Sequence, residues 1–153
     1  MRTRAMLLCY GRTRCTGARE CEAAMRDTAV DMVVMEGERH TTVLLSGEMD
    51  RMSAPAVRRR LLDLAAAAYR PLVLDLAGVS FFDAEGLRVV SSAARRCDEL
   101  GVGLATVGVR PFAAKMFHIL RLHERIPLCS STEEALWCLL PPTDAELAAW
   151  LNG

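Results

Sequence analysis

The sequence predicts an α/β domain built on a mostly parallel sheet of about five strands. Two observations carry this prediction. Short apolar runs bounded by turn residues alternate along the chain with longer segments whose apolar residues recur every three or four positions. Strands separated by helices pair in parallel through right-handed crossovers. The predicted order, β-β-α-β-α-β-α-β-α, therefore gives one hairpin that continues into a parallel sheet with helices packed on it.

The predicted elements follow one another without an internal repeat. In chain order they are strands at 31–36 and 41–46, a helix from Ser53 to a break at Pro71, a strand at 72–76 with a further apolar run at 79–82, a helix from Asp83 to about Leu100, a strand at 103–107, a helix at 111–120, an extended piece at 125–128, and two short helices that begin at Ser131 and Thr143.

The first two strands and the helix after them have clear local signals. The Gly-Glu-Arg turn at 37–39 joins two β-branched and apolar runs, which predicts a hairpin. Ser53 is a favoured N-cap residue, and Pro55 is acceptable in the first turn of a helix. Val57 and Leu61 begin an apolar face at helical spacing.

The centre of the domain is predicted at the next strand and helix. The run LVLDL at 72–76 is nearly continuous in apolar residues, as in parallel strands buried on both faces. Asp83 is a good N-cap for the following helix, because its carboxylate can accept from the N–H groups of Glu85 or Gly86. Gly101 stops that helix.

The last helices begin at recognisable caps. Pro111 opens the helix at 111–120, since proline fits a first helical turn. Ser131 and Thr143 each stand three residues before a glutamate, Glu134 and Glu146, which is the pattern of a capping box. We therefore expect two short helices at the C-terminal end.

Composition limits the function classes. The 153 residues are 52% apolar and 25% charged, with 19 basic and 19 acidic residues, which is typical of a single folded domain. No apolar run reaches the ~18 residues of a membrane span. A formal net charge of zero also argues against a dedicated nucleic-acid-binding protein.

The neutral total conceals a division of the chain. Residues 1–26 hold six arginines and two glutamates, whereas the rest holds 13 basic and 17 acidic residues. We expect a basic arm at 1–30 that is disordered or is not part of the native protein, a domain at 31–140, and a short helical tail at 141–153. The six cysteines lack the spacing of a zinc site or a disulfide scaffold, which indicates a reducing, cytoplasmic environment.

Common catalytic and cofactor motifs are absent from the sequence. It contains no GxGxxG, no GxxxxGK[ST] and no GxSxG pattern, so we expect no cofactor, no metal and no enzymatic activity. The remaining candidates are three carboxylates at the ends of predicted strands: Asp50, Asp83 and Glu85. The ends of neighbouring parallel strands meet at one edge of a sheet, where such sheets usually carry function. Structural roles, such as helix capping, are the simplest explanation of these carboxylates.

The sequence around these carboxylates resembles a known family. VLLSGEMD ends at Asp50, LVLDLAGVSFFDAEGLRVV includes Asp83 and Glu85, and SSTEEAL opens a later helix. Together they resemble the STAS domain of bacterial anti-sigma factor antagonists over about residues 31–138. The resemblance implies a small α/β domain with a mostly parallel sheet and helices largely on one side. It also implies a protein-binding module rather than an enzyme.

The resemblance further implies regulation by partner switching. Such an antagonist binds an anti-sigma factor, often a serine kinase of the histidine-kinase-like ATPase type, and releases the sigma factor. The kinase phosphorylates a Ser or Thr just before the Gly of a D-x-[ST]-G motif, and the phosphorylated antagonist no longer binds. By this comparison, the partner-binding residues are Asp50, Asp83, Ala84, Glu85, Gly86 and Leu87.

This chain departs from the pattern at the phosphoacceptor. Glu85 stands before Gly86, and Ala84 also lacks a hydroxyl group. A glutamate carries about −1 where a phosphoserine carries about −1.5 to −2. Glu85 is then either a built-in partial mimic of the phosphorylated state or part of a surface reused for a partner that needs no such switch. We expect the carboxylates to form an acidic patch that suits a basic groove on a partner.

Two other functions remain open at this stage. The chain could be a cytoplasmic STAS subunit that regulates a membrane transporter. An enzyme would instead use Asp50, Asp83 and Glu85 as acid/base groups or as metal ligands. We expect no direct contact with nucleic acid under either of the binding-module hypotheses.

Overall fold

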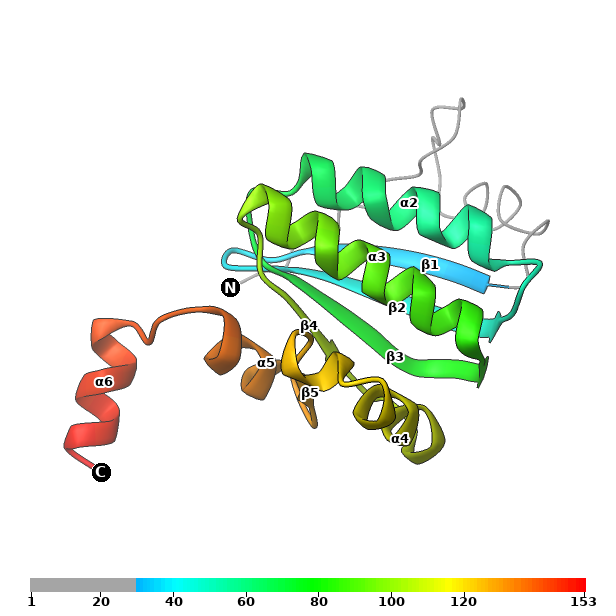
Figure 1. The fold of residues 1–153 in the computed structure, drawn as a ribbon. Helices are drawn as coiled ribbons and strands as arrows, with labels where there is room; N and C mark the ends of the chain where they lie inside the picture. The colour runs from blue at the N-terminus through cyan, green and yellow to red at the C-terminus, as the bar shows by residue number, and fades with distance from the viewer. Residues whose placement is uncertain (1–29) are drawn as a thin grey trace.

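A five-stranded sheet forms the centre of the computed structural model, which describes residues 30–153 (Figure 1). Its strands, in the order in which they lie side by side, are β1 (Val30–Glu36), β2 (Thr41–Met49), β3 (Leu72–Phe82), β4 (Leu104–Val107) and β5 (Leu128–Cys129). β1 pairs with β2 in the antiparallel direction, and the other three pairings are parallel. The predicted α/β class, with a mostly parallel sheet of five strands, is confirmed.

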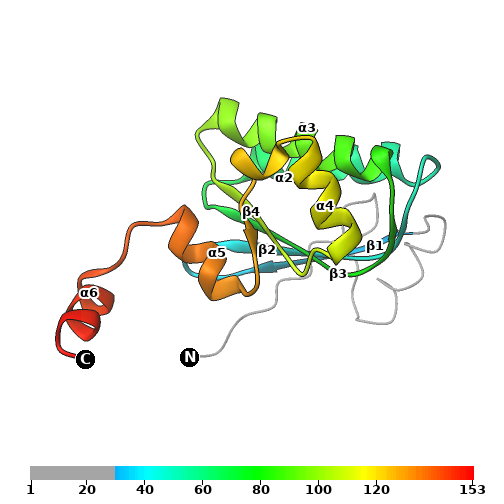
Figure 2. The same ribbon diagram turned by 60° about the horizontal axis from the view of Figure 1, so that its bottom comes forward.

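The helices follow the predicted order. They are α2 (Ala54–Ala67), α3 (Ala84–Leu100), α4 (Pro111–Ile119), the short 3₁₀ helix η1 (Leu122–Glu124), α5 (Thr132–Leu139) and α6 (Asp144–Leu151). α2 and α3 run side by side across one face of the sheet (Figure 1). The second view shows α4 near the same face, whereas α5 lies away from α2 and α3 (Figure 2).

The side chains of β3 alternate between the two faces of the sheet, and each face packs against a different group of helices. Side chains of a strand point in turn to opposite faces of the sheet. Leu72 and Leu74 belong to the main core, which also includes buried residues of α2, α3 and α4. Val73, between them, packs in a second cluster with Ala135 of α5. The nearly continuous apolar run of β3 therefore reflects burial on both faces, as predicted.

β3 is longer than the sequence predicts. The expected strand at 72–76 and the apolar run at 79–82 form one strand, joined across an irregularity in its pairing with β2. Gly78 lies at this irregularity, where a Cβ atom would stand 2.8 Å from the Cβ of Ser46. The absence of a side chain lets the two backbones approach closely, and the strand then continues to Phe82.

Two C-terminal predictions need correction. The extended piece expected at 125–128 is shorter, because η1 comes just before it and β5 holds only two residues. Ser131 caps α5, but Glu134 accepts hydrogen bonds from Ser130 rather than from Ser131, so the reciprocal capping box is incomplete. At Thr143 the complete capping box with Glu146 is present.

α6 projects from the rest of the domain (Figures 1 and 2). Arg39, which lies between β1 and β2, forms a 3.1 Å ion pair with Glu146 of α6. The predicted boundary between the domain and a tail at 141–153 stays a prediction. The predicted basic arm at 1–30 lies outside the described residues, apart from its last residue. No helix within residues 30–153 is both long enough and apolar enough to cross a membrane.

Candidate functional site

The register of β2 and β3 brings the predicted site together. Met49, the last residue of β2, pairs with Phe82, the last residue of β3. Asp50 and Asp83 come directly after this pair and therefore leave the sheet at the same edge. The sequence predicted this shared edge from the parallel order of the strands.

Asp83 caps α3, as predicted. Its Oδ1 atom accepts hydrogen bonds from the backbone N–H of Glu85 at 2.9 Å and of Gly86 at 3.1 Å. These N–H groups have no partner within the helix, so the cap satisfies donors that would otherwise need water. The Asp83 side chain fixes the first turn of α3 and, with it, the position of Glu85.

Glu85 lies in that first turn and is paired with an arginine. Its Oε1 atom lies 2.8 Å from the NH1 atom of Arg88, one turn along α3. The Glu85 side chain is 35% exposed and that of Arg88 is 75% exposed. The carboxylate also meets the positive end of the helix dipole, a contribution of roughly 0.3–1 kcal/mol. The carboxylate therefore has two favourable but weak electrostatic contacts, one with the helix dipole and one with Arg88.

Gly86 and Leu87 attach α3 to the sheet. A Cβ atom on Gly86 would lie 2.9 Å from the Cγ of Met49 and 3.0 Å from the ring of Phe82. Leu87 is 2% exposed and belongs to the main core, whereas Ala84 is exposed. The direct participation of Leu87 and Gly86 in partner binding stays a prediction, since both are buried here.

Asp50 organises the turn between β2 and α2. Its Oδ1 atom accepts from the backbone N–H groups of Met52 and Ser53, both at 2.9 Å. The Ser53 hydroxyl donates to the carbonyl of Glu48 at 2.8 Å. The hydrogen bond from the Ser53 backbone, foremost among these contacts, holds the pKa of Asp50 below its usual value. Asp50 is thus an ionised turn residue.

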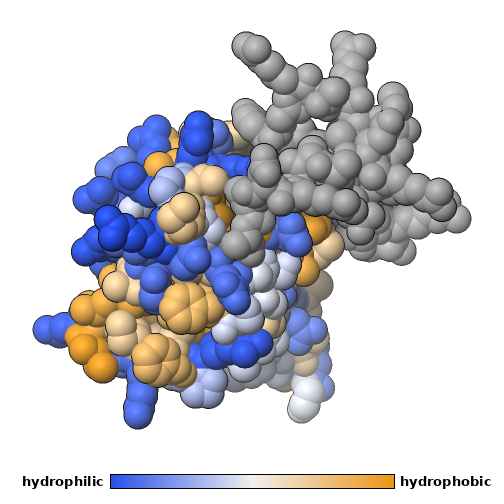
Figure 3. Space-filling model, turned by 90° about the vertical axis from the view of Figure 1, so that its right-hand side faces the viewer, coloured by the Kyte–Doolittle hydropathy of each residue, from blue (hydrophilic) through white to orange (hydrophobic). Residues whose placement is uncertain are grey.

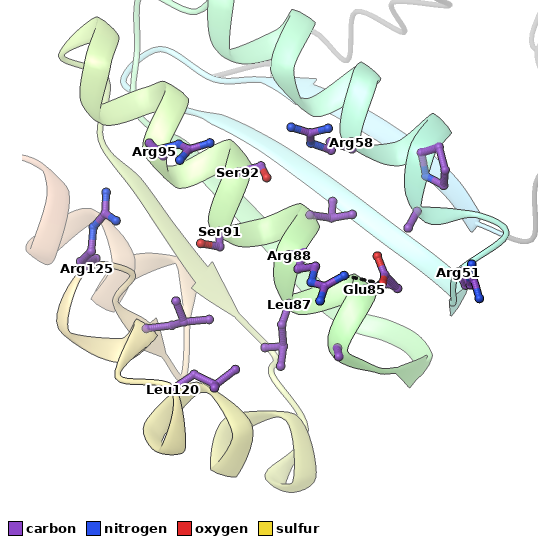
Figure 4. Close-up of a pocket in the computed structure, with 15 residues that line it drawn as sticks. Arg51, Arg58, Glu85, Leu87, Arg88, Ser91, Ser92, Arg95, Leu120 and Arg125 are labelled. Carbon is purple, nitrogen blue, oxygen red and sulfur yellow. Dashed lines mark hydrogen bonds and ion pairs between the residues drawn. The ribbon is translucent and has the colours of Figure 1, made fainter.

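The surface beside α3 is more basic than the sequence suggested. An open groove of about 960 Å³ runs along α2 and α3 from Ala84 and Glu85 (Figure 4). The charged residues that line it are Arg51, Arg58, Glu85, Arg88, Arg95 and Arg125. Two of the three carboxylates expected to form an acidic patch are hydrogen-bonded to the backbone, and the third is paired with Arg88. Sequence reasoning missed the groove, although the seven-residue spacing of Arg88 and Arg95 was a signal for one shared helix face.

Exposed hydrophobic side chains lie in and just after α4. Phe112, Ile119 and Leu120, in and just after α4, are 69%, 72% and 53% exposed. The face of the molecule that includes α4 shows this apolar area in its lower part (Figure 3). Leu120 also lines the groove, so the apolar and basic surfaces meet there.

No cluster of three potential metal ligands occurs among the His, Cys, Asp and Glu side chains of residues 30–153.

The family of the chain follows from a comparison of its sequence with protein-family models. Residues 32–130 match the model described as "Mlab, STAS domain". The chain belongs to the STAS family. This match covers more than half of the sequence and includes both strand ends of the candidate site.

Solved structures of three other bacterial proteins have the same fold. An anti-sigma factor antagonist from Mycobacterium paratuberculosis is 24% identical, with a TM-score of 0.65, and the match covers 72% of this chain and 93% of that one. A STAS domain protein from Planctomyces limnophilus is 20% identical, with a TM-score of 0.60 and coverage of 72% and 98%. The phosphorylated form of the Bacillus cell fate determinant SpoIIAA is 17% identical, with a TM-score of 0.56 and coverage of 71% and 98%. The resemblance of the sequence to anti-sigma factor antagonists is confirmed at the level of the fold.

Proposed function

We propose that this STAS domain is a binding module of the anti-sigma factor antagonist type, which regulates transcription by partner switching with an anti-sigma factor. The observation that carries the proposal is the first turn of α3. Asp83 caps it through two backbone N–H groups, and Glu85 occupies the position that corresponds to the phosphorylatable Ser or Thr. The partner is an anti-sigma factor, in the first instance a serine kinase of the histidine-kinase-like ATPase type.

Glu85 removes the phosphorylation switch at this position. Neither Glu85 nor Ala84 has a hydroxyl group that could accept a phosphoryl group. If Glu85 mimics the phosphorylated state, the domain binds a kinase-type partner weakly at all times. If the surface has been reused, the domain binds a partner that needs no switch.

The ion pair with Arg88 favours the second alternative. A mimic of phosphoserine has to present its negative charge to the partner, but the Glu85 carboxylate lies 2.8 Å from a guanidinium group. Four further arginines line the adjoining groove. A partner that approaches α3 therefore meets a surface that is basic overall.

The Glu85→Ser variant tests the proposal. It restores a hydroxyl group before Gly86, and Glu85→Ala is the matched control because it removes the carboxylate without adding a hydroxyl. Both variants and the native chain are used to capture proteins from the host with and without ATP, and the bound proteins are identified by mass spectrometry. We expect the native chain to retain an anti-sigma factor both with and without ATP, and the proposed function fails if it retains none. Phosphorylation of Glu85→Ser, but not of the native chain or Glu85→Ala, would support the mimic hypothesis over the reused surface. The mimic hypothesis fails if Glu85→Ser gains neither phosphorylation nor binding.

A second candidate is a cytoplasmic regulatory subunit of a membrane transporter. A transporter subunit would need no phosphorylation switch. The lack of a phosphoacceptor at Glu85 therefore favours this function to the same extent as it favours any other permanent partner. The capture experiment separates the two functions, because a transporter subunit would be retained in place of an anti-sigma factor. Neighbouring genes for a transporter, rather than for a kinase or sigma factor, would point the same way.

An enzyme remains the least supported function. Asp50 and Asp83 use their carboxylates to hold backbone N–H groups, and Glu85 is paired with Arg88. Titration calorimetry with Mg²⁺ and Ca²⁺ tests for a metal-dependent role of these carboxylates. Heat of binding that disappears in an Asp50→Asn variant would support the enzyme, and absence of heat would contradict it.

A further inference from the structure

We propose that the groove along α2 and α3 binds an acidic segment of a protein partner, and that Arg58 and Arg95 pair with its carboxylates. This inference deepens the proposed function, on which it rests, by naming the chemistry of the partner's docking segment. It differs from the expectation drawn from the sequence, in which an acidic patch meets a basic partner.

The first argument is the charge that remains after internal pairing. Arg88 is paired with Glu85, and Arg125 lies 2.8 Å from Asp98. Arg51, Arg58 and Arg95 also line the groove, and none of the three forms an ion pair with another residue in the described range 30–153. Three uncompensated positive charges therefore share one concave surface, in a part of the chain whose acidic residues outnumber its basic ones.

The second argument is the geometry of the charges. Arg88 and Arg95 are two helical turns apart, about 10 Å along α3, and therefore share a face of the helix. Ser91 and Ser92 lie between them as further hydrogen-bond donors and acceptors, and Arg58 is on the neighbouring α2 (Figure 4). A partner segment in the groove would meet guanidinium groups from both helices. Each can bind a carboxylate in a bidentate manner.

The third argument concerns the class of the partner. Leu120, which lines the groove, is 53% exposed, and the exposed side chains of Phe112 and Ile119 are close to it in the chain. Arginine combined with exposed aromatic and aliphatic side chains is typical of protein–protein interfaces. Domains that bind nucleic acid usually carry a clear basic excess, whereas the part of this chain after residue 26 is acidic overall.

A defined peptide tests the inference directly. The probe is a labelled peptide of about 18 residues, or five helical turns, patterned as an amphipathic helix with glutamate on one face and leucine on the other. A peptide with lysine in place of glutamate is its counterpart. Binding to the full chain is measured by fluorescence anisotropy at low and high salt. We expect the glutamate peptide to bind, the lysine peptide not to bind, and salt to weaken the complex.

Charge reversal locates the binding surface. We expect the double variant Arg58→Glu/Arg95→Glu to raise the Kd for the glutamate peptide at least about tenfold. The matched control is Arg59→Glu/Arg110→Glu, which makes the same change in net charge at two exposed arginines outside the groove lining. We expect the control to stay within about twofold of the native Kd, because neither side chain lines the groove and exposed charges without direct contact interact weakly. Circular dichroism verifies that both variants fold.

Several outcomes would overturn the inference. They are absence of glutamate-peptide binding, equal binding of the lysine peptide, and equal weakening by both double variants. Tighter binding of a single-stranded oligonucleotide or of phosphatidylglycerol vesicles, with the same dependence on Arg58 and Arg95, would show a polyanion site instead.

The partner captured from the host provides an independent measurement. A photo-crosslinking amino acid in place of Ser92 is expected to attach to a partner segment of net negative charge, and a neutral or basic segment would contradict the inference. If the anti-sigma factor is captured equally well by Arg58→Glu/Arg95→Glu, the proposed function stands and the inference fails. If no anti-sigma factor is captured but the glutamate peptide binds as expected, the proposed function fails and the groove chemistry stands.

Discussion

The Oε1 atom of Glu85 lies 2.8 Å from the NH1 atom of Arg88 in the first turns of α3. The pair joins Glu85, the proposed equivalent of the phosphoacceptor, with the beginning of the basic groove. Because Arg88 is 75% exposed, its guanidinium can leave Glu85 and bind a carboxylate of a partner without disturbing the core. The strength of this ion pair therefore decides how freely the site can respond to a partner.

We expect the coupling between Glu85 and Arg88 to be weak, about 0.2–0.5 kcal/mol, because exposed pairs one turn apart on a helix contribute little. A double-mutant cycle with Glu85→Gln, Arg88→Gln and the combined variant, measured by urea denaturation, gives this value. Each single variant should change the free energy of unfolding by less than about 1 kcal/mol. A coupling several times larger would mean that Arg88 is held in place and is not available to a partner.

Asp83 is expected to matter for stability as a helix cap. Asp83→Ala leaves the N–H groups of Glu85 and Gly86 without the acceptor that they have in the native chain, which should cost about 0.5–2 kcal/mol. Asp83→Asn retains an oxygen acceptor and is the matched control, with a smaller loss. Both values come from urea denaturation. Equal losses in the two variants would show that the charge of Asp83, rather than its capping hydrogen bonds, stabilises α3.

The fold was largely predictable because its signals are local. The caps at Asp83 and Thr143 and the apolar run of β3 each depend on neighbouring residues in the chain. The continuation of β3 to Phe82 was missed, since the pairing irregularity at Gly78 depends on the contact with Ser46 in another strand. Local patterns do not contain such contacts.

The candidate site was only partly predictable, for the same reason. Asp50 and Asp83 could be placed at one sheet edge from the order of the strands alone. The groove could not, because it combines Arg58 of α2 with Arg95 of α3, and because Arg125 reaches it from beyond η1. The pairing of Glu85 with Arg88 also required side-chain geometry. The sequence predicted an acidic surface at this site, whereas these contacts leave a surface that is basic overall.

A larger residue in place of Gly86 is expected to destabilise the domain. A Cβ atom there would stand 2.9 Å from Met49 and 3.0 Å from Phe82, and both neighbours lie at the ends of paired strands. Overpacking of this kind costs about 1–3 kcal/mol, partly offset by the better helix propensity of alanine, about 1 kcal/mol. We therefore expect Gly86→Ala to lower the free energy of unfolding by up to about 2 kcal/mol in urea denaturation. An increase in stability would show that Met49 and Phe82 can move aside.

Acid should weaken the turn between β2 and α2. The pKa of Asp50 lies below its usual value of 3.8, chiefly because of the hydrogen bond from the Ser53 backbone. Its folded-state pKa is thus lower than its unfolded-state pKa, so its contribution to stability is complete above about pH 4 and is lost as the pH falls through the folded-state pKa. The free energy of unfolding between pH 2 and 5 should therefore change less steeply in Asp50→Asn than in the native chain. Some pH dependence should persist, because hydrogen bonds from Ser130 and Thr143 also lower the pKa values of Glu134 and Glu146. Identical slopes in the two proteins would contradict the assignment to Asp50.

The three described cysteines should differ in their reactivity toward alkylating agents. Burial raises the pKa of Cys97 to about 11 and that of Cys129 to about 12, so very little thiolate is present at neutral pH. Cys138 is exposed on α5. We expect iodoacetamide at neutral pH to modify Cys138 well before the other two, and denaturant to remove the difference. Peptide mass spectrometry follows each site separately, and Cys138→Ser is the control for selectivity. Early modification of Cys129 in the native protein would mean that α5 opens from β5, since Cys129 packs in the small core with Ala135.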